Sequence, residues 1–156
     1  MTQNQYEEKL KKWIAENNVQ AEQLHFEKSC HSVAEAALAV GTDESNFVKN
    51  ICMIDVQGKL IVCIVKGEDR VSTTKVGELL KIEKPKTATP EEILEKTGYP
   101  CGGTPSFSYQ AKFLIDQRVM EKDVVYSGGG SENSLVRIST IELQKANNGK
   151  VVRIRK

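Results

Sequence analysis

The sequence predicts an α/β (α+β) fold: one domain over residues 1–156, with a mixed, mostly antiparallel, barrel-like sheet and peripheral helices. Its length of 156 residues lies in the usual range of one domain, and its 39% hydrophobic and 28% charged residues are typical of a globular protein. Runs of β-branched residues interleave with amphipathic, capped segments, and some adjacent runs are separated only by turn residues. No internal repeat or low-complexity linker divides the chain.

The N-terminal part carries two predicted helices with a short extended segment between them. Apolar side chains recur at spacings of three and four from Gln5 to Asn17, which is typical of an amphipathic helix: Tyr6, Leu10, Trp13 and Ile14. Residues 23–27 alternate only briefly and suit a strand or a loop. Ser32 and Glu35 have capping-box spacing, which predicts a helix from Val33 to about Val40 that ends at Gly41.

The middle of the chain predicts a hairpin, two short helices and an irregular loop. Residues 50–55 and 60–66 are rich in Ile, Val, Cys and Met and flank a four-residue turn. A helix is expected over 74–80, and another after Thr89, with Pro90 at its first position and its end at Gly98. The segment Tyr99 to Tyr109 then gathers glycines and prolines into a long loop, which is where functional residues often lie.

The C-terminal part predicts strands over 113–115, 124–127 and 135–138. Glycines 128–130 separate the last two strands. Ser139 and Glu142 have capping-box spacing and predict a helix to about Ala146, closed by residues 147–149. A final strand is expected over 151–155, with Val152 and Ile154 on one face and Arg153 and Arg155 on the other. With Lys150 and Lys156, these arginines suit a strip that binds an RNA backbone. A solvated outer strand face explains them equally well, and we prefer it.

Composition excludes several classes of function. The net charge is +1, from 22 basic and 21 acidic residues, so no strong field favours DNA, and an RNA partner would be gripped by local contacts at a strand end. No apolar run reaches the roughly 18 residues of a membrane span, and the polar residues 1–5 do not form a signal-peptide core. We therefore expect a cytoplasmic protein without a membrane partner.

Metal and cofactor chemistry are also not expected. The four cysteines lack metal-ligand spacing and are expected to be reduced thiols: Cys30, Cys52, Cys63 and Cys101. The two histidines, His25 and His31, do not suggest a catalytic triad, and surface or half-buried rings explain them better. No phosphate-binding or dinucleotide-binding glycine motif occurs, so no cofactor is expected.

Two glycine clusters and one lysine are candidate site residues. Adjacent Gly102 and Gly103 can point successive N–H groups into one concavity that binds an anion or an oxyanion, although a simple turn explains them more often. Residues 127–130 have the same alternatives, with a flexible hairpin tip as the common one. Lys49, just before an apolar strand, would by itself be a solvated charge.

Several short motifs occur along the chain in one order. They are His31 to Ala37 with Gly41, Phe47-Val48-Lys49, Val65 to Val71, Ala88 to Glu92, Thr97 to Tyr99, Gly102 to Phe107, Leu114 to Asp116, and Val125 to Gly129. In this order they resemble the YbaK / prolyl-tRNA-synthetase-associated editing family, from about Ser29 to Ile154. The helix and lead-in of residues 1–28 are not covered. The resemblance implies a mixed α/β barrel-like domain that strips wrongly attached amino acids, such as cysteine or alanine, from tRNA.

The resemblance also implies a site. Lys49 matches the functional lysine of the family, and Gly102 and Gly103 match its glycine-rich substrate loop, so these three are the expected catalytic residues. The expected substrate-binding residues are Thr104, Pro105, Ser106, Phe107, Ser127, Gly128, Gly129 and Asp116. Asp116 is equally well explained as a turn residue at a strand end. The chain departs from the family where Ser106 replaces a proline and where Ser108-Tyr109 replaces Gly-His.

The resemblance implies a free-standing deacylase acting in trans. Its expected partners are the 3′ end of an aminoacyl-tRNA, with tRNA-Pro as the carrier, and an aminoacyl-tRNA synthetase. Ester hydrolysis there needs a placed water and oxyanion stabilisation more than a strong side-chain base. The alternative is a homologue without turnover that binds a tRNA end or a synthetase, and the features that favour it are Ser106 and Tyr109.

Overall fold

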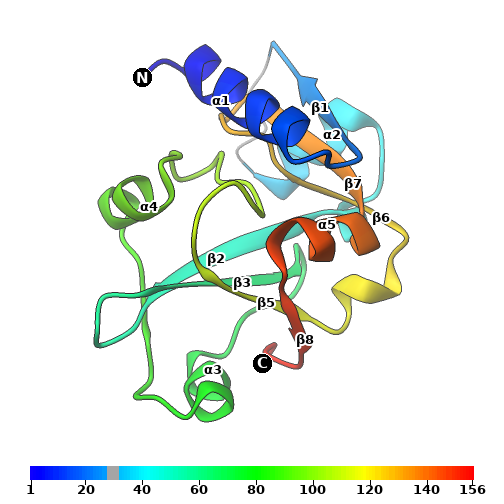
Figure 1. The fold of residues 1–156 in the computed structure, drawn as a ribbon. Coiled ribbons are helices and arrows are strands. Elements are labelled where there is room, and N and C mark those ends of the chain that lie inside the picture. Colours follow the sequence, from blue (N-terminus) through cyan, green and yellow to red (C-terminus); the bar gives the residue numbers. More distant parts are fainter. Residues whose placement is uncertain (28–31) are drawn as a thin grey trace.

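The computed structural model describes residues 1–27 and 32–156, which form two β-sheets with helices around them (Figure 1). The helices are α1 (Gln3–Glu16), α2 (Val33–Val40), α3 (Thr73–Leu80), α4 (Pro90–Thr97) and α5 (Thr140–Asn147), with short 3-10 turns η1 (Glu44–Asn46) and η2 (Val119–Glu121). The strands are β1 (Ala21–His25), β2 (Val48–Ile54), β3 (Leu60–Lys66), β4 (Lys86–Thr87), β5 (Lys112–Asp116), β6 (Val124–Gly128), β7 (Ser134–Ser139) and β8 (Lys150–Val152).

The smaller sheet is antiparallel and the larger one is mixed. The smaller sheet has the order β1-β7-β6, and the larger has the order β4-β2-β3-β5-β8. In the larger sheet β3 pairs with β5, and β5 with β8, in parallel, whereas β2 pairs antiparallel with β3 and β4. The expected mixed, mostly antiparallel fold with peripheral helices is confirmed. The two sheets touch through a bridge between Phe47 and Tyr126 but do not close into a barrel over the described residues.

Strand β3 organises the core because both of its faces are buried. Val62 and Ile64 face the larger apolar cluster, which also takes Leu10 of α1 and Val136 of the smaller sheet. The alternate residues of β3 face a second cluster that includes Val76 of α3. Figure 1 shows α1 beside the smaller sheet, and α3 on the side of the larger sheet that faces away from the smaller one. A strand covered on both faces reads as a continuous apolar run, and this explains the sequence of β3.

Most predicted elements are found within a few residues of their expected bounds. Residues 23–27 were expected to be a strand or loop, and the chain forms β1 over Ala21–His25. The Thr89 cap makes both hydrogen bonds of a capping box with Glu92, whereas Ser32 and Ser139 make only the bond to the backbone N–H three residues on. No helix within residues 1–27 and 32–156 is long and apolar enough to cross a membrane.

The predicted final strand is partly wrong. Strand β8 ends at Val152, because the carboxylate of buried Asp116 accepts the backbone N–H groups of Ile154 and Arg155 at 2.9 and 3.2 Å. Val152 and Ile154 are buried and Arg153 is exposed, as the alternation predicts. Arg155 does not lie on a solvated face: its Nη1 donates to Asp116 Oδ2 at 2.9 Å.

Candidate functional site

A pocket of about 290 Å³ opens where β2 begins, beside β6 and the loop after α4. Its polar lining comes from Ser32, Lys49, Asn50, Cys101, Thr104 and Ser127, with the backbone of Gly102 and Gly128. Its other lining residues are apolar or aromatic: Val33, Ala36, Phe47, Val48, Ile51, Ile93, Tyr126 and Leu135. The fold thus brings five of the expected site residues to one cavity, from three separate parts of the chain: Lys49, Gly102, Thr104, Ser127 and Gly128.

Lys49 brings a positive charge to the wall of this pocket. It stands at the second position of β2 and is partly buried. Burial lowers the pKa of Lys49 below the ordinary value, nearby Arg70 lowers it further, and Asp69 opposes both. The described part of the chain offers its ammonium no hydrogen-bond or ion-pair partner. The charge is therefore available to an anionic or carbonyl oxygen of a ligand.

The glycine loop lies directly against the loop that follows β6. The backbone carbonyl of Gly103 accepts the N–H of Gly130 at 2.8 Å. A Cβ on Gly103 would lie 2.6 Å from the backbone nitrogen of Ser131, and a Cβ on Gly128 would collide with the carbonyl of Thr104. Both positions therefore need glycine because two backbones touch there.

The two adjacent amides of the glycine loop differ. The N–H of Gly103 donates to the carbonyl of Pro100 at 3.0 Å, so a turn already uses it. Gly102 is exposed, has a φ of +91°, and its N–H meets no acceptor among residues 1–27 and 32–156. Of the two, Gly102 has the amide that a ligand can use.

Beneath the pocket, three side chains form a closed ring of hydrogen bonds. Ser106 is fully buried, and its hydroxyl donates to Asn50 Oδ1 at 2.7 Å. Asn50 Nδ2 donates to Ser127 Oγ at 3.1 Å and to the carbonyl of Thr104 at 2.9 Å. The hydroxyls of Ser106 and Ser127 lie 2.6 Å apart, and since Ser106 has only one proton, Ser127 is the donor of that pair. The ring fixes the floor of the pocket.

Sequence reasoning missed Asn50. An asparagine inside an otherwise apolar strand, next to the candidate lysine, is a polar group that needs partners when the strand is buried. That pattern could have marked it. Its partners lie 54, 56 and 77 residues away along the chain, which no local pattern predicts.

Several expected site residues do not line the pocket. Phe107 is buried and stacks on Trp13 of α1, with ring centroids 5.3 Å apart. The carbonyl of Pro105 accepts the Tyr109 hydroxyl at 2.6 Å. Gly129 packs against the backbone of Ser134, and Gly103 and Ser106 stand behind the lining residues. These residues shape the loops around the pocket rather than its surface.

Asp116 lies outside the pocket and is held by structural contacts. Burial alone would raise its pKa, but hydrogen bonds from the N–H groups of Ile154, Arg118 and Arg155 and from the Arg155 side chain outweigh burial, and the pKa is lowered. The carboxylate therefore stays charged and joins β5 to the C-terminal segment. Its geometry fits the turn-residue explanation.

The chemistry available in the pocket is limited. Within the described lining there is no carboxylate and no imidazole. No group of at least three His, Cys, Asp or Glu residues that could hold a metal ion occurs in residues 1–27 and 32–156. Cys101 is exposed and lines the pocket, whereas burial raises the pKa of Cys52 and Cys63 to about 12. Cys30 and His31 lie outside the described residues.

Comparison with solved structures supports the fold. A hypothetical protein, APE2540, superposes with a TM-score of 0.87 at 30% identity, covering 95% of this chain and 99% of that one. A protein described as a candidate trans-editing enzyme for prolyl-tRNA synthetase gives a TM-score of 0.89 at 23% identity, with 97% of both chains covered.

Sequence comparison gives the family. The uncharacterized protein YwhH of Bacillus subtilis is 26% identical over 141 residues, covering 89% of this chain and 87% of that protein. Proline–tRNA ligase of Acidithiobacillus ferrooxidans is 31% identical over 71 residues, which are 46% of this chain and 12% of the ligase. The family model of the aminoacyl-tRNA editing domain matches residues 27–146. The pocket thus lies in a chain that belongs to the aminoacyl-tRNA editing domain family.

Proposed function

We propose that this protein is a free-standing deacylase that hydrolyses the ester of a mischarged aminoacyl-tRNA. The observation that carries the proposal is one pocket in an editing-domain chain where the Lys49 ammonium, the free Gly102 N–H and the fixed Asn50–Ser106–Ser127 ring converge. The proposed substrate is a small amino acid, such as cysteine or alanine, on tRNA-Pro. A cytoplasmic location and contact with an aminoacyl-tRNA synthetase belong to the same proposal.

The proposed mechanism uses positioned donors rather than a side-chain base. The Gly102 N–H would polarise the ester carbonyl and stabilise the oxyanion that forms when water attacks, because Gly102 is an exposed residue of the pocket lining and its N–H has no described acceptor. The Lys49 ammonium would bind the terminal phosphate or a substrate oxygen. The attacking water would lose its proton to a hydroxyl, amine or thiol of the substrate. That proton would pass to the ribose oxygen, which leaves as a hydroxyl when the ester C–O bond breaks, so the products are the free amino acid and uncharged tRNA.

The size of the pocket supports a small amino acid. Its volume of about 290 Å³ has to hold the amino acid and part of the terminal ribose. Val33, Ala36 and Ile93 are side-chain walls that suit an apolar or weakly polar group, while the polar floor suits the ester and the ribose hydroxyls.

A second candidate is a binding module without turnover. The observation that favours it is the absence of a carboxylate or imidazole from the described lining. The Tyr109 hydroxyl does not supply an acid or base either, because it donates to Pro105 and burial raises its pKa well above the ordinary value. Such a protein would hold the end of a charged tRNA or bind a synthetase.

Release of amino acid from charged tRNA separates the two candidates. Purified protein is incubated with tRNA-Pro charged separately with cysteine, alanine, serine and proline, and free amino acid is followed over time. We expect release of alanine or cysteine and retention of proline. Saturable binding of charged tRNA with no release above the spontaneous rate would favour the binding module.

A further inference from the structure

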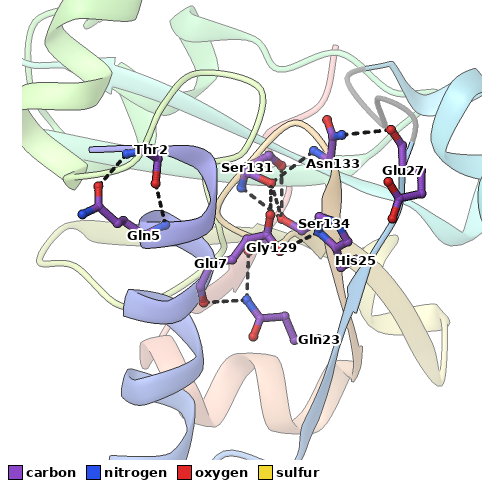
Figure 2. A network of polar contacts seen from close by, with 10 residues as sticks. All are labelled: Thr2, Gln5, Glu7, Gln23, His25, Glu27, Gly129, Ser131, Asn133 and Ser134. Carbon is purple, nitrogen blue, oxygen red and sulfur yellow. Dashed lines mark hydrogen bonds and ion pairs between the residues drawn. The ribbon is translucent and has the colours of Figure 1, made fainter.

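The helix α1, which precedes the matched family region, contacts the turn between β6 and β7 through a buried carboxylate. Glu7 is only 8% exposed, and Figure 2 shows it facing the loop between β6 and β7. Its Oε2 accepts the hydroxyl of Ser131 at 2.7 Å, and its Oε1 lies 2.9 Å from His25 Nδ1. Gln23 adds a second connection, with Nε2 donating to the carbonyls of Glu7 and Gly129 at 2.9 and 3.1 Å.

A carboxylate determines the direction of this network because it only accepts hydrogen bonds. Ser131 must donate its one proton to Glu7, so its oxygen is left to accept the N–H of Asn133 at 3.2 Å. The N–H of Ser131 donates in turn to Ser134 Oγ at 3.0 Å. The turn between β6 and β7 is therefore fixed from the side of α1.

The same turn lies directly behind the substrate loop. Gly130 donates its N–H to the carbonyl of Gly103 at 2.8 Å, and a Cβ on Gly103 would come within 2.6 Å of the nitrogen of Ser131. Ser131 thus stands between Glu7 on one side and Gly103 on the other. Gly102, whose N–H faces a ligand in the proposed function, directly precedes Gly103 in the loop.

We propose that Glu7 is a positioning residue for the editing site: through Ser131 it holds the β6–β7 turn against Gly103 and so sets the place of the Gly102 amide. Its effect on turnover rests on the proposed function. The placing of the loop does not, and it can be measured without substrate. An oxyanion donor acts only where the charge develops, so a small displacement of Gly102 lowers the rate of the chemical step more than it lowers binding.

The test is Glu7→Gln, with Glu8→Gln as the matched control on the exposed neighbour. Glutamine keeps the size of the side chain but removes its charge, so the Ser131 hydroxyl loses its bond to a carboxylate and has at most a neutral amide oxygen as its acceptor. Amide exchange of Gly130 in the full chain, read against core amides of Val62 and Ile64, measures whether the turn has loosened. We expect exchange of Gly130 to become about tenfold faster in Glu7→Gln only, with the core amides unchanged.

Kinetics test the effect on the site. With alanyl-tRNA-Pro as the probe, we expect kcat to fall about tenfold in Glu7→Gln while KM stays within about twofold. Ser131→Ala removes the loop side of the contact and takes the place of Glu7→Gln if that variant does not fold. The effects of the two substitutions combined should be smaller than their product, because both break the same contact.

The possible outcomes test the positioning role of Glu7 separately from the proposed function. Gly130 exchange that stays at the wild-type rate in both Glu7→Gln and Ser131→Ala would overturn the positioning role, and so would faster exchange with unchanged kcat in an active protein. If wild-type protein releases no amino acid, the proposed function fails. The exchange rates alone then decide whether Glu7 places the loop.

Discussion

Lys49 is a partly buried positive charge that lines the pocket. Burial lowers the pKa of Lys49, and no described residue pairs with its ammonium, which marks it as a candidate ligand-binding group. The sequence alone gave it no weight beyond a solvated charge at a strand start. Its importance followed from the resemblance, and the structure adds its place on the pocket wall.

Replacing Lys49 should therefore stop the reaction and spare the fold. We expect Lys49→Ala to reduce kcat/KM by at least about 100-fold, as loss of one transition-state donor does, with the melting temperature almost unchanged. Lys49→Arg should restore little, because a planar guanidinium does not replace a compact ammonium in a pocket of this size. Lys59→Ala, on the exposed hairpin turn, is the control. Full activity of Lys49→Ala would remove Lys49 from the site.

Ser106 stands where the resemblance implies a proline, and its side chain is buried. Its hydroxyl completes the ring with Asn50 and Ser127, so Ser106→Ala leaves Asn50 Oδ1 without its donor and should cost about 1–3 kcal/mol of stability. We also expect the ratio of rates among alanine, cysteine and serine esters to shift, because Asn50 and Ser127 line the pocket. Urea unfolding and the four-tRNA assay measure both. An unchanged ratio would show that the ring does not shape selectivity.

Of the three cysteines within the described residues, Cys101 should be the thiol through which alkylation acts. It is exposed in the pocket lining, whereas Cys52 and Cys63 are buried with pKa values raised to about 12 and stay protonated thiols. We expect a bulky maleimide to block release in the wild type and to have little effect on Cys101→Ser, which itself stays active. Mass spectrometry locates the label, and EDTA serves as a parallel treatment that should leave activity unchanged. Loss of activity in Cys101→Ser would give the thiol a direct role.

Among the elements, those with local signals were predicted well. Capping residues and C-terminal glycines mark α2 and α4, because caps satisfy groups within one helical turn. The predicted end of β8 was wrong because Asp116 accepts the backbone N–H groups of Ile154 and Arg155, which lie 38 and 39 residues further along the chain. The contact between the two glycine loops was likewise beyond local reasoning. The sequence of each loop on its own predicts only a turn.

The close contact between the two glycine loops predicts the effect of adding a methyl group at Gly128. Gly128→Ala would drive a Cβ into the carbonyl of Thr104 and should separate the loop after β6 from the Gly102–Gly103 loop. We expect the free energy of unfolding to fall by about 1–3 kcal/mol, and the rate of amino acid release to fall as well. Gly41→Asn is the matched control, because Gly41 has a φ of +77° with open space around it, and asparagine tolerates that conformation. Chemical denaturation and amide exchange of Gly130 measure both. A Gly128→Ala protein with wild-type stability and turnover would contradict this packing.

At the scale of the whole molecule, Asp116 joins parts of the chain that are far apart in sequence. Its carboxylate accepts N–H groups from Ile154 and Arg155, a third from Arg118, and the Arg155 guanidinium. These contacts attach the C-terminal segment to β5 in the larger sheet, where β3 lies between β5 and the pocket strand β2. The residue expected at the substrate is thus better placed to affect stability.

The pH dependence of unfolding should show this role. The pKa of Asp116 is lowered in the folded protein, so its contribution to stability is complete above the unfolded value of about 4 and is lost as the pH falls towards the folded value. Asp116→Asn turns an amide donor towards other donors and should cost about 3 kcal/mol at pH 7, roughly 6–12 °C in melting temperature. The difference between wild type and variant should narrow below about pH 4, as the wild-type carboxylate becomes protonated. Urea titrations at pH 7 and pH 3 measure this difference in stability, with Asp123→Asn on the exposed turn before β6 as the control.

Because Asp116 lies outside the pocket, Asp116→Asn should release amino acid at the wild-type rate at 25 °C while it remains folded. A variant of full stability that cannot release amino acid would instead return Asp116 to the site.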